Sequence, residues 1–279
     1  MKIGIIGMGT MGGGIAQQCS ASGFDVVVKE IDQAALDRGR AVMEARLARS
    51  VEKGRLTGAD HAAQLDRMSY VTDYEKLKGC DLIIECIRED MATKKEFFSE
   101  LNALDLKNTI VASNTSSLSI TELAMQYRYP GKVIGMHFFN PVTSMQLVEV
   151  IRGLTTEDAV NDAVIDIARQ LGKTPVRVQD APGFVVNRIL IPMINEAIGI
   201  YAEGVAECED IDTALKLGSN HPMGPLELGD LIGLDVCLSV MDVLHEEFGD
   251  SKYRAHPLLR RMVRANQLGR KTKHGFYRY

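Results

Sequence analysis

One histidine and one glutamate occupy positions from which they could exchange a proton with a substrate. His137 ends the apolar run Lys132–His137, and Glu149 lies inside the next apolar run, Gln146–Ile151. A carboxylate in an apolar strand is costly unless it is paired, and the strand nearest in sequence carries His137. Such a pair would orient the imidazole ring, fix its tautomer and favour its protonated form. The pattern therefore predicts a general acid–base pair, with a structural ion pair at the end of a sheet as the alternative.

A glycine-rich segment near the N-terminus predicts a dinucleotide-binding loop. Gly7, Gly9 and Gly12 form a GxGxxG pattern that directly follows a predicted strand and opens a predicted helix, which is the context that makes the pattern specific. The first glycine permits a tight turn, the second lets the backbone approach a pyrophosphate, and the third lets the helix pack closely on the strand. The helix N-terminus would offer N–H groups and a partial positive charge to the phosphates. The predicted contacts in this loop are Gly7, Met8, Gly9, Thr10, Met11 and Gly12.

The acidic residue expected to bind the adenosine ribose is Glu30. It follows the predicted strand Asp25–Val28 and lies close to the expected distance of about 20 residues after the last glycine of the loop. A carboxylate there can bind the ribose hydroxyls and would repel a 2′-phosphate, so NAD is favoured over NADP. Asp32 is a second candidate, although its position also suits the N-cap of the following helix.

Two further polar positions could contact a substrate. Residues 113–117 read Ser-Asn-Thr-Ser-Ser after the apolar run Thr109–Ala112, so their hydroxyls would lie at a strand end, where open α/β sheets bind ligands. A turn that leads into a helix cap explains this cluster equally well. Asn187 lies on an apolar helix face just after the breaker Ala181-Pro182-Gly183. Its amide could bond a carbonyl across a cleft, or it could be structural.

Short β-branched runs alternate with helical patterns over the first 180 residues, which predicts a doubly wound α/β domain. Several runs are apolar throughout, as expected for strands buried on both faces of a parallel sheet. The expected strands are Lys2–Ile6, Asp25–Val28, Asp81–Glu85, Thr109–Ala112, Lys132–His137, Gln146–Ile151 and Pro175–Val178. The expected helices are Thr10–Ser22, Asp32–Lys53, Thr57–Met68 and Met91–Leu104, with a capping box at Ser119–Glu122 and another helix from Thr155 to about Leu171.

The character of the sequence changes after Asp180, where the breaker cluster lies. No convincing alternating strand follows it. Helical patterns cover Phe184–Glu203, Glu209–Leu217, Pro225–Phe248 and Pro257–Gln267. We therefore expect a Rossmann-type α/β domain over residues 1–182 and an all-α domain over residues 183–279.

Composition excludes several classes of protein. The 279 residues carry 32 Lys and Arg against 37 Asp and Glu, and this mild acidity argues against a nucleic-acid binder, which should carry a basic face. No stretch approaches the roughly 20 apolar residues of a membrane span, and glycines interrupt the N-terminal apolar run, unlike a signal peptide. The five cysteines include no CxxC pair. They predict reduced thiols in a cytoplasmic protein and give no support to a zinc site.

Six motifs in matching order make the chain similar, over essentially its whole length, to the short-chain L-3-hydroxyacyl-CoA dehydrogenases, the 3-hydroxybutyryl-CoA dehydrogenase group. The motifs are Gly7–Gly12, Ser113–Ser117, His137–Pro141 with Leu147–Val150, Ala181–Arg188, His221–Pro225 and Gly269–Tyr277. The resemblance implies an oxidoreductase of fatty acid metabolism that uses NAD to interconvert (S)-3-hydroxyacyl-CoA and 3-ketoacyl-CoA. It also implies a homodimer formed through the helical C-terminal domain, which would close the substrate cleft.

The resemblance assigns roles to individual residues. His137 matches the catalytic base and Glu149 its carboxylate partner. Ser116 matches a hydroxyl near the substrate and the nicotinamide, and Asn187 matches the amide that contacts the reacting acyl group. The other matches are Glu30 for the ribose, Glu89, Lys94, Asn140 and Lys271 for further cofactor contacts, and Lys53 for the CoA phosphate.

The chain departs from the family pattern at a few positions. Cys86 and Arg88 replace small and apolar residues, and Lys273-His274 occupies a turn where the family often has Gly first. A four-carbon substrate is expected because Met145 and Phe138-Phe139 imply a confined pocket. One alternative is a 3-hydroxyadipyl-CoA dehydrogenase of aromatic catabolism, if Arg88 or another cation reaches the acyl tail. The others are a dehydrogenase of a free hydroxy acid and a catalytically silent NAD-binding structural protein.

Overall fold

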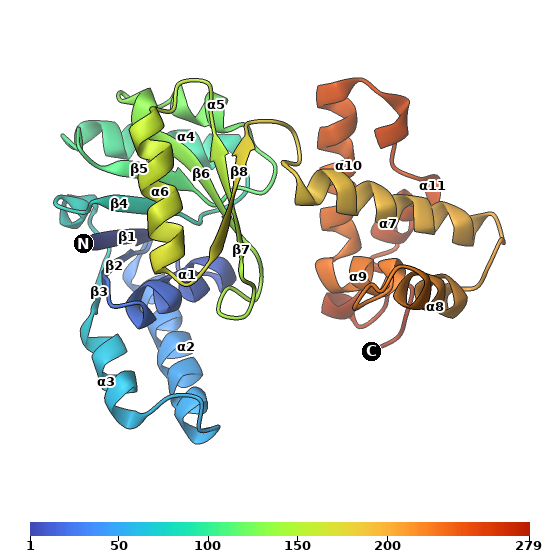
Figure 1. Cartoon of the computed structure of the whole chain (residues 1–279), viewed down its shortest axis with the longest axis horizontal. Coiled ribbons are helices and arrows are strands. Elements are labelled where there is room, and N and C mark those ends of the chain that lie inside the picture. Colours follow the sequence, from blue (N-terminus) through green and yellow to red (C-terminus); the bar gives the residue numbers. More distant parts are fainter. The chain divides into compact units, whose positions relative to one another are not determined.

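The computed structural model describes all 279 residues and divides into two units, Met1–Asp180 and Ala181–Tyr279 (Figure 1). The first unit is built on one eight-stranded sheet with the strand order β3-β2-β1-β4-β5-β6-β7-β8. Its strands are β1 (Lys2–Ile6), β2 (Asp25–Lys29), β3 (Met68–Val71), β4 (Leu82–Glu85), β5 (Ile110–Ser113), β6 (Val133–Phe138), β7 (Leu147–Arg152) and β8 (Thr174–Gln179).

The centre of this sheet is the point where the winding of the chain reverses. β1 lies between β2 and β4 and pairs with both in parallel. Ile6, the last residue of β1, lies opposite Lys29 on one side and Glu85 on the other, so the three strands end together. The loop after β1 therefore opens at the topological switch point, where open α/β sheets bind ligands.

Helices cover both faces of the sheet, which confirms the predicted doubly wound class. Side chains of α1 and α6 share one apolar core with the sheet, and α4 and α5 cover the opposite face (Figure 1). Predicted caps are present: Asp32 accepts a hydrogen bond from Ala35 N at 2.7 Å, and Ser119 accepts one from Glu122 N at 3.2 Å. The helices are α1 (Thr10–Ala21), α2 (Gln33–Glu52), α3 (Gly58–Asp66), α4 (Met91–Ala103), α5 (Ile120–Ala124) and α6 (Asp158–Gln170), with 3₁₀ turns at Tyr74–Leu77 and Pro130–Lys132.

Two features of the sheet differ from the expectation. The strands from β3 to β6 are parallel, but β7 runs antiparallel to β6, and β8 follows β7 in parallel. The edge strand β3 was not predicted, and Met68 was assigned to the end of a helix. Only Met68 of its four residues is buried, so β3 lacks the continuous apolar run that marks the central strands.

The second unit is helical, as predicted. Its core is formed by apolar side chains from all five helices, α7 to α11, among them Ile194, Leu226 and Cys237. The single helix expected over Pro225–Phe248 is wrong, because the chain breaks at Gly233 with φ of +106°. The elements are α7 (Val186–Ala202), α8 (Cys208–Gly218), α9 (Pro225–Ile232), α10 (Leu234–Phe248) and α11 (Pro257–Arg264), with 3₁₀ turns at Ser251–Tyr253 and Arg270–Thr272. None of the helices in either unit has the length and apolar character needed to cross a membrane.

Candidate active site

The reversal of β7 brings His137 and Glu149 together. The two residues lie directly opposite each other in the antiparallel pair β6–β7, so their side chains leave the same face of the sheet. His137 Nδ1 lies 2.8 Å from Glu149 Oε2. The side chains are 8% and 1% exposed, respectively. The carboxylate foreseen in an apolar strand therefore has the imidazole as a partner.

This contact determines which ring nitrogen of neutral His137 carries the hydrogen. An ionised glutamate can only accept a hydrogen bond, so with Glu149 ionised Nδ1 of His137 carries a hydrogen, and in the neutral ring Nε2 is the nitrogen with a lone pair. The ring also lies 4.5 Å from the ring of Phe139, measured between centroids. The end of β6 is held by the residue that follows the neighbouring strand β5, because Phe138 N donates to Asn114 Oδ1 at 2.9 Å. Asn114 belongs to the polar cluster that the sequence placed after β5.

The glycine loop after β1 has the geometry that a pyrophosphate requires. A Cβ atom on Gly12 would lie 1.9 Å from the carbonyl oxygen of Gly7, whereas a Cβ atom on Gly9 would meet nothing within 4 Å. Gly9 is the N-cap of α1, with no side-chain cap and no acidic residue in the first turn. The helix N-terminus is therefore open to an anion beside a backbone without side-chain bulk. These features fit a dinucleotide phosphate.

Glu30 is the acidic group beside this loop. Its carboxylate accepts hydrogen bonds from Met8 N at 2.5 Å and from Ile31 N at 3.0 Å. Asp32, the other candidate, serves as the N-cap of α2. The end of β2 therefore presents one carboxylate to the loop, in the position that suits a ribose contact.

A second acidic group, Glu89, holds the polar loop after β5. Its Oε1 accepts hydrogen bonds from Thr115 Oγ1 at 2.6 Å, Ser116 N at 2.7 Å and Ser117 N at 3.1 Å. Burial acts to raise the pKa of Glu89, but the charge of Lys94 and these hydrogen bonds outweigh burial, so the pKa lies below its usual value. An ionised Glu89 thus fixes the backbone around Ser116.

Lys94 lies behind Glu89 rather than at the surface. It is 1% exposed, and its Nζ lies 2.7 Å from both carboxylate oxygens of Glu85 and 3.4 Å from Glu89 Oε2. Glu85 was not identified from the sequence. The signal that identified Glu149, a glutamate in an apolar strand, was equally present in β4.

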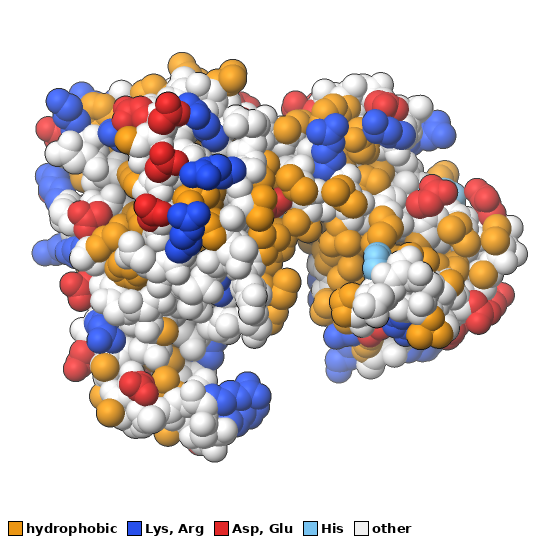
Figure 2. Space-filling model, in the orientation of Figure 1, with side chains coloured by type: hydrophobic (Ala, Val, Ile, Leu, Met, Phe, Trp, Pro, Cys, Tyr) orange, Lys and Arg blue, Asp and Glu red, His pale blue; other side chains and the backbone are white.

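The other predicted site residues lie elsewhere. Asn140 is exposed in the loop between β6 and β7, and Lys53 is the exposed C-cap residue of α2. Figure 2 shows basic side chains gathered at that end of α2. Asn187 and Lys271 belong to the second unit, where Asn187 lies in the first turn of α7 and Lys271 forms an ion pair with Asp235.

Comparison with known proteins identifies the family. The family model described as "3-hydroxyacyl-CoA dehydrogenase, NAD binding domain" matches residues 2–181. The model of the C-terminal domain of 3-hydroxyacyl-CoA dehydrogenase matches residues 183–279. The chain belongs to the 3-hydroxyacyl-CoA dehydrogenase family. The resemblance drawn from the motifs, the NAD cofactor and the assignment as an oxidoreductase of CH–OH groups are thereby confirmed.

Members of this family resemble the chain over its full length. A 3-hydroxybutyryl-CoA dehydrogenase of Clostridioides difficile is 58% identical and aligns over 100% of this chain and 99% of that protein. The mitochondrial hydroxyacyl-coenzyme A dehydrogenase of Homo sapiens is 39% identical and aligns over 99% of this chain and 90% of that protein. The crystal structure of (S)-3-hydroxybutyryl-CoA dehydrogenase PaaH1 from Ralstonia eutropha is 50% identical, with a TM-score of 0.97 and coverage of 100% and 98%.

Proposed function

We propose that the protein is an NAD-dependent 3-hydroxybutyryl-CoA dehydrogenase that interconverts (S)-3-hydroxybutyryl-CoA and acetoacetyl-CoA. The observation that carries this proposal is the buried His137–Glu149 pair, held at 2.8 Å beside the ends of the strands in a chain of this family. The names of two relatives that align with the chain over nearly the full length of both proteins support the four-carbon substrate.

The protein handles the proton and places the reactants. When bound, NAD supplies the acceptor for the hydride. In the oxidation, neutral His137 accepts the proton of the 3-hydroxyl group at Nε2, and Glu149 stabilises the imidazolium that forms. Ser116 and Asn187 donate hydrogen bonds to oxygen atoms on which negative charge develops. In the reduction, His137 returns the proton. Because the reduction consumes one proton from solution overall, lower pH shifts the equilibrium toward the hydroxyacyl product.

The cofactor would be held mainly by backbone groups and two carboxylates. The glycine loop binds the pyrophosphate, Glu30 binds the adenosine ribose, and Glu89 lies on the nicotinamide side of the switch point. Lys94 contributes through Glu89, because it is buried against Glu85. Asn140 and Lys271 are proposed as further cofactor contacts, and Lys53 as a contact of the CoA phosphate.

A panel of 3-ketoacyl-CoA substrates tests the proposed function. We expect rapid loss of NADH absorbance with acetoacetyl-CoA, slower turnover with longer chains, and none with free acetoacetate. We also expect at least about tenfold lower kcat/KM with NADPH, because Glu30 repels a 2′-phosphate. A dicarboxylic 3-ketoacyl-CoA that reacts faster than acetoacetyl-CoA would instead establish the hydroxyadipyl alternative. A protein that binds NADH but turns over none of these substrates would be a silent NAD-binding protein.

A neutral substitute for the carboxylate tests the role of Glu149. Glu149→Gln keeps the shape of the side chain but removes the negative charge that stabilises the imidazolium formed when His137 accepts the proton. We expect kcat for the oxidation to fall at least about tenfold, while the dissociation constant of NADH changes little. Asp162→Asn is the matched control, since Asp162 pairs with Arg177 on the surface. Turnover at the wild-type rate in Glu149→Gln would contradict the pairing.

We infer that the chain acts as a homodimer in cytoplasmic fatty acid metabolism, with the domain boundary at residue 182 and the helical domain of residues 183–279 forming the dimer. The exposed apolar residues Ile189 on α7 and Leu231 on α9, 68% and 47% exposed, support an interface there. The five cysteines are free thiols, as is usual for proteins of a reducing compartment. Light scattering of the purified protein would measure the oligomeric state.

A further inference from the structure

A buried ion pair lies directly behind the loop that carries Ser116, and the mechanism above gives no role to its carboxylate, Glu85. Glu85 ends β4 and Lys94 lies in the first turn of α4, and each side chain is 1% exposed. Burying two charges costs free energy that their attraction recovers only when every remaining hydrogen bond is made. A pair of this kind is therefore weak evidence for added stability. Its role is better judged from the segments of the chain that it holds together.

Glu85 joins three segments at the carboxyl ends of neighbouring strands. Its Oε2 accepts a hydrogen bond from Ser113 Oγ on β5 at 2.7 Å, and its Oε1 accepts one from Ile87 N after β4 at 2.8 Å. Lys94 Nζ on α4 contacts both oxygens. The carboxylate thus sets the spacing of β4, β5 and α4 at the edge of the sheet where the candidate site lies.

Lys94 connects this arrangement to the loop after β5. Its Nζ lies 3.4 Å from Glu89 Oε2, and the other oxygen of Glu89 accepts hydrogen bonds from Ser116 N and Ser117 N. The Glu89 side chain is 36% exposed, and both of its carboxylate oxygens are held by the groups that bind them. A continuous chain of charged contacts therefore runs from Glu85 through Lys94 and Glu89 to the backbone of Ser116.

We propose that Glu85 is a positioning residue for the dehydrogenase reaction and that it acts through Lys94 and Glu89 on the placement of Ser116. The proposal rests on the proposed function, in which Ser116 donates a hydrogen bond to an oxygen of the reacting acyl group. Displacing a reacting group by about 1 Å can cost up to about 100-fold in rate. Glu85→Gln is therefore expected to lower kcat about tenfold, because an amide has one acceptor oxygen where the carboxylate has two, and it has no charge to hold the Lys94 ammonium.

A double-mutant cycle in the full-length enzyme tests this coupling. The turnover of acetoacetyl-CoA with saturating NADH is measured for the wild type, Glu85→Gln, Ser116→Ala and the double variant. If Glu85 acts through Ser116, Glu85→Gln lowers kcat about tenfold alone but less than about twofold when Ser116 is already alanine. Ser113→Ala, which removes one hydroxyl donor of Glu85, replaces Glu85→Gln in the same cycle if the latter does not fold.

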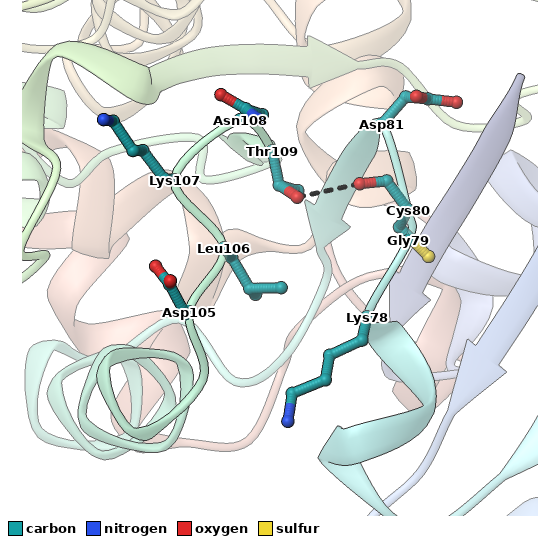
Figure 3. A pocket seen from close by; sticks show the side chains of 9 residues that line it. All are labelled: Lys78, Gly79, Cys80, Asp81, Asp105, Leu106, Lys107, Asn108 and Thr109. Atoms are coloured by element: carbon teal, nitrogen blue, oxygen red, sulfur yellow. Dashed lines mark hydrogen bonds between the residues drawn. The ribbon is translucent and has the colours of Figure 1, made fainter.

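The chain offers a matched structural control at the opposite end of the same two strands. Thr109, just before β5, donates from Oγ1 to the carbonyl oxygen of Cys80, just before β4, at 2.8 Å, and it is 5% exposed (Figure 3). Thr109→Val removes this buried link between the two segments but leaves the carboxyl ends of the strands unchanged. We expect it to lower the melting temperature while kcat stays within about twofold of the wild type.

The outcomes separate the two proposals. Unchanged kcat in Ser116→Ala would overturn the role of Ser116 in the proposed function, and with it the route through Glu85. If Ser116→Ala and Glu85→Gln each lower kcat and their two effects multiply in the double variant, the proposed function stays intact and the positioning role is overturned. Equal effects of Thr109→Val and Glu85→Gln on kcat would also overturn it, because the loss would then follow from general loosening of the strands.

Discussion

Replacing His137 with glutamine is expected to lower kcat by about 10²–10⁴, the usual contribution of a general acid–base residue. Glutamine can still accept a hydrogen bond from the substrate hydroxyl, but it cannot take up the proton. The imidazole is the group that Glu149 holds at 2.8 Å, and no second histidine lies in β6 or β7. The measurement is the loss of NADH absorbance with acetoacetyl-CoA, together with the dissociation constant of NADH from its fluorescence.

The binding measurement distinguishes a chemical role from a structural one. The NADH dissociation constant should change less than about threefold, because His137 is not among the residues proposed to bind the cofactor. His245→Gln is the matched control, since His245 is exposed in the last turn of α10. Turnover at the wild-type rate in His137→Gln would refute the assignment. A parallel loss of turnover and NADH binding would show that the substitution had disturbed the fold.

The sequence was most informative where one physical requirement fixed the residue type. β1 begins and ends where the apolar run predicted, because a strand buried on both faces must be apolar throughout. The half-buried edge strand β3 carries no such requirement and was missed. The prediction of one long helix over Pro225–Phe248 was wrong because helical periodicity continues on both sides of Gly233. A single residue with positive φ does not change that periodicity.

The sequence predicts the residue types of the candidate site better than the contacts between those residues. The cost of a carboxylate in an apolar strand was enough to connect Glu149 with His137. The same cost applies to Glu85 in β4, but its partner Lys94 lies on a helix nine residues later and not on a neighbouring strand. The contact of Lys94 with the cofactor stays a prediction, but the burial of Lys94 between two carboxylates was not foreseen. Long-range pairs between a strand and a helix depend on tertiary packing, which no periodicity in the sequence records.

Two alanine substitutions in the glycine loop are expected to separate cofactor binding from folding. Gly9→Ala adds a Cβ atom with no protein atom within 4 Å, and the extended backbone of Gly9 at φ −67° accepts alanine. Its melting temperature should therefore stay within about 2 °C of the wild type. The added methyl group would occupy the space through which a pyrophosphate approaches the N–H groups of α1. Loss of one or two such charge-assisted hydrogen bonds should weaken NADH binding about 10–100-fold.

Gly12→Ala should impair both properties, because its Cβ atom would lie 1.9 Å from the carbonyl oxygen of Gly7 and the backbone of either α1 or the loop must move. Overpacking of this kind typically costs about 1–3 kcal/mol, and the displaced N–H groups would no longer converge on the phosphates. Calorimetry and NADH fluorescence on both variants provide the comparison. If Gly9→Ala bound NADH as tightly as the wild type, the phosphates would have to lie away from the N-terminus of α1. A loop that bound the cofactor normally in both variants would have no role in holding it.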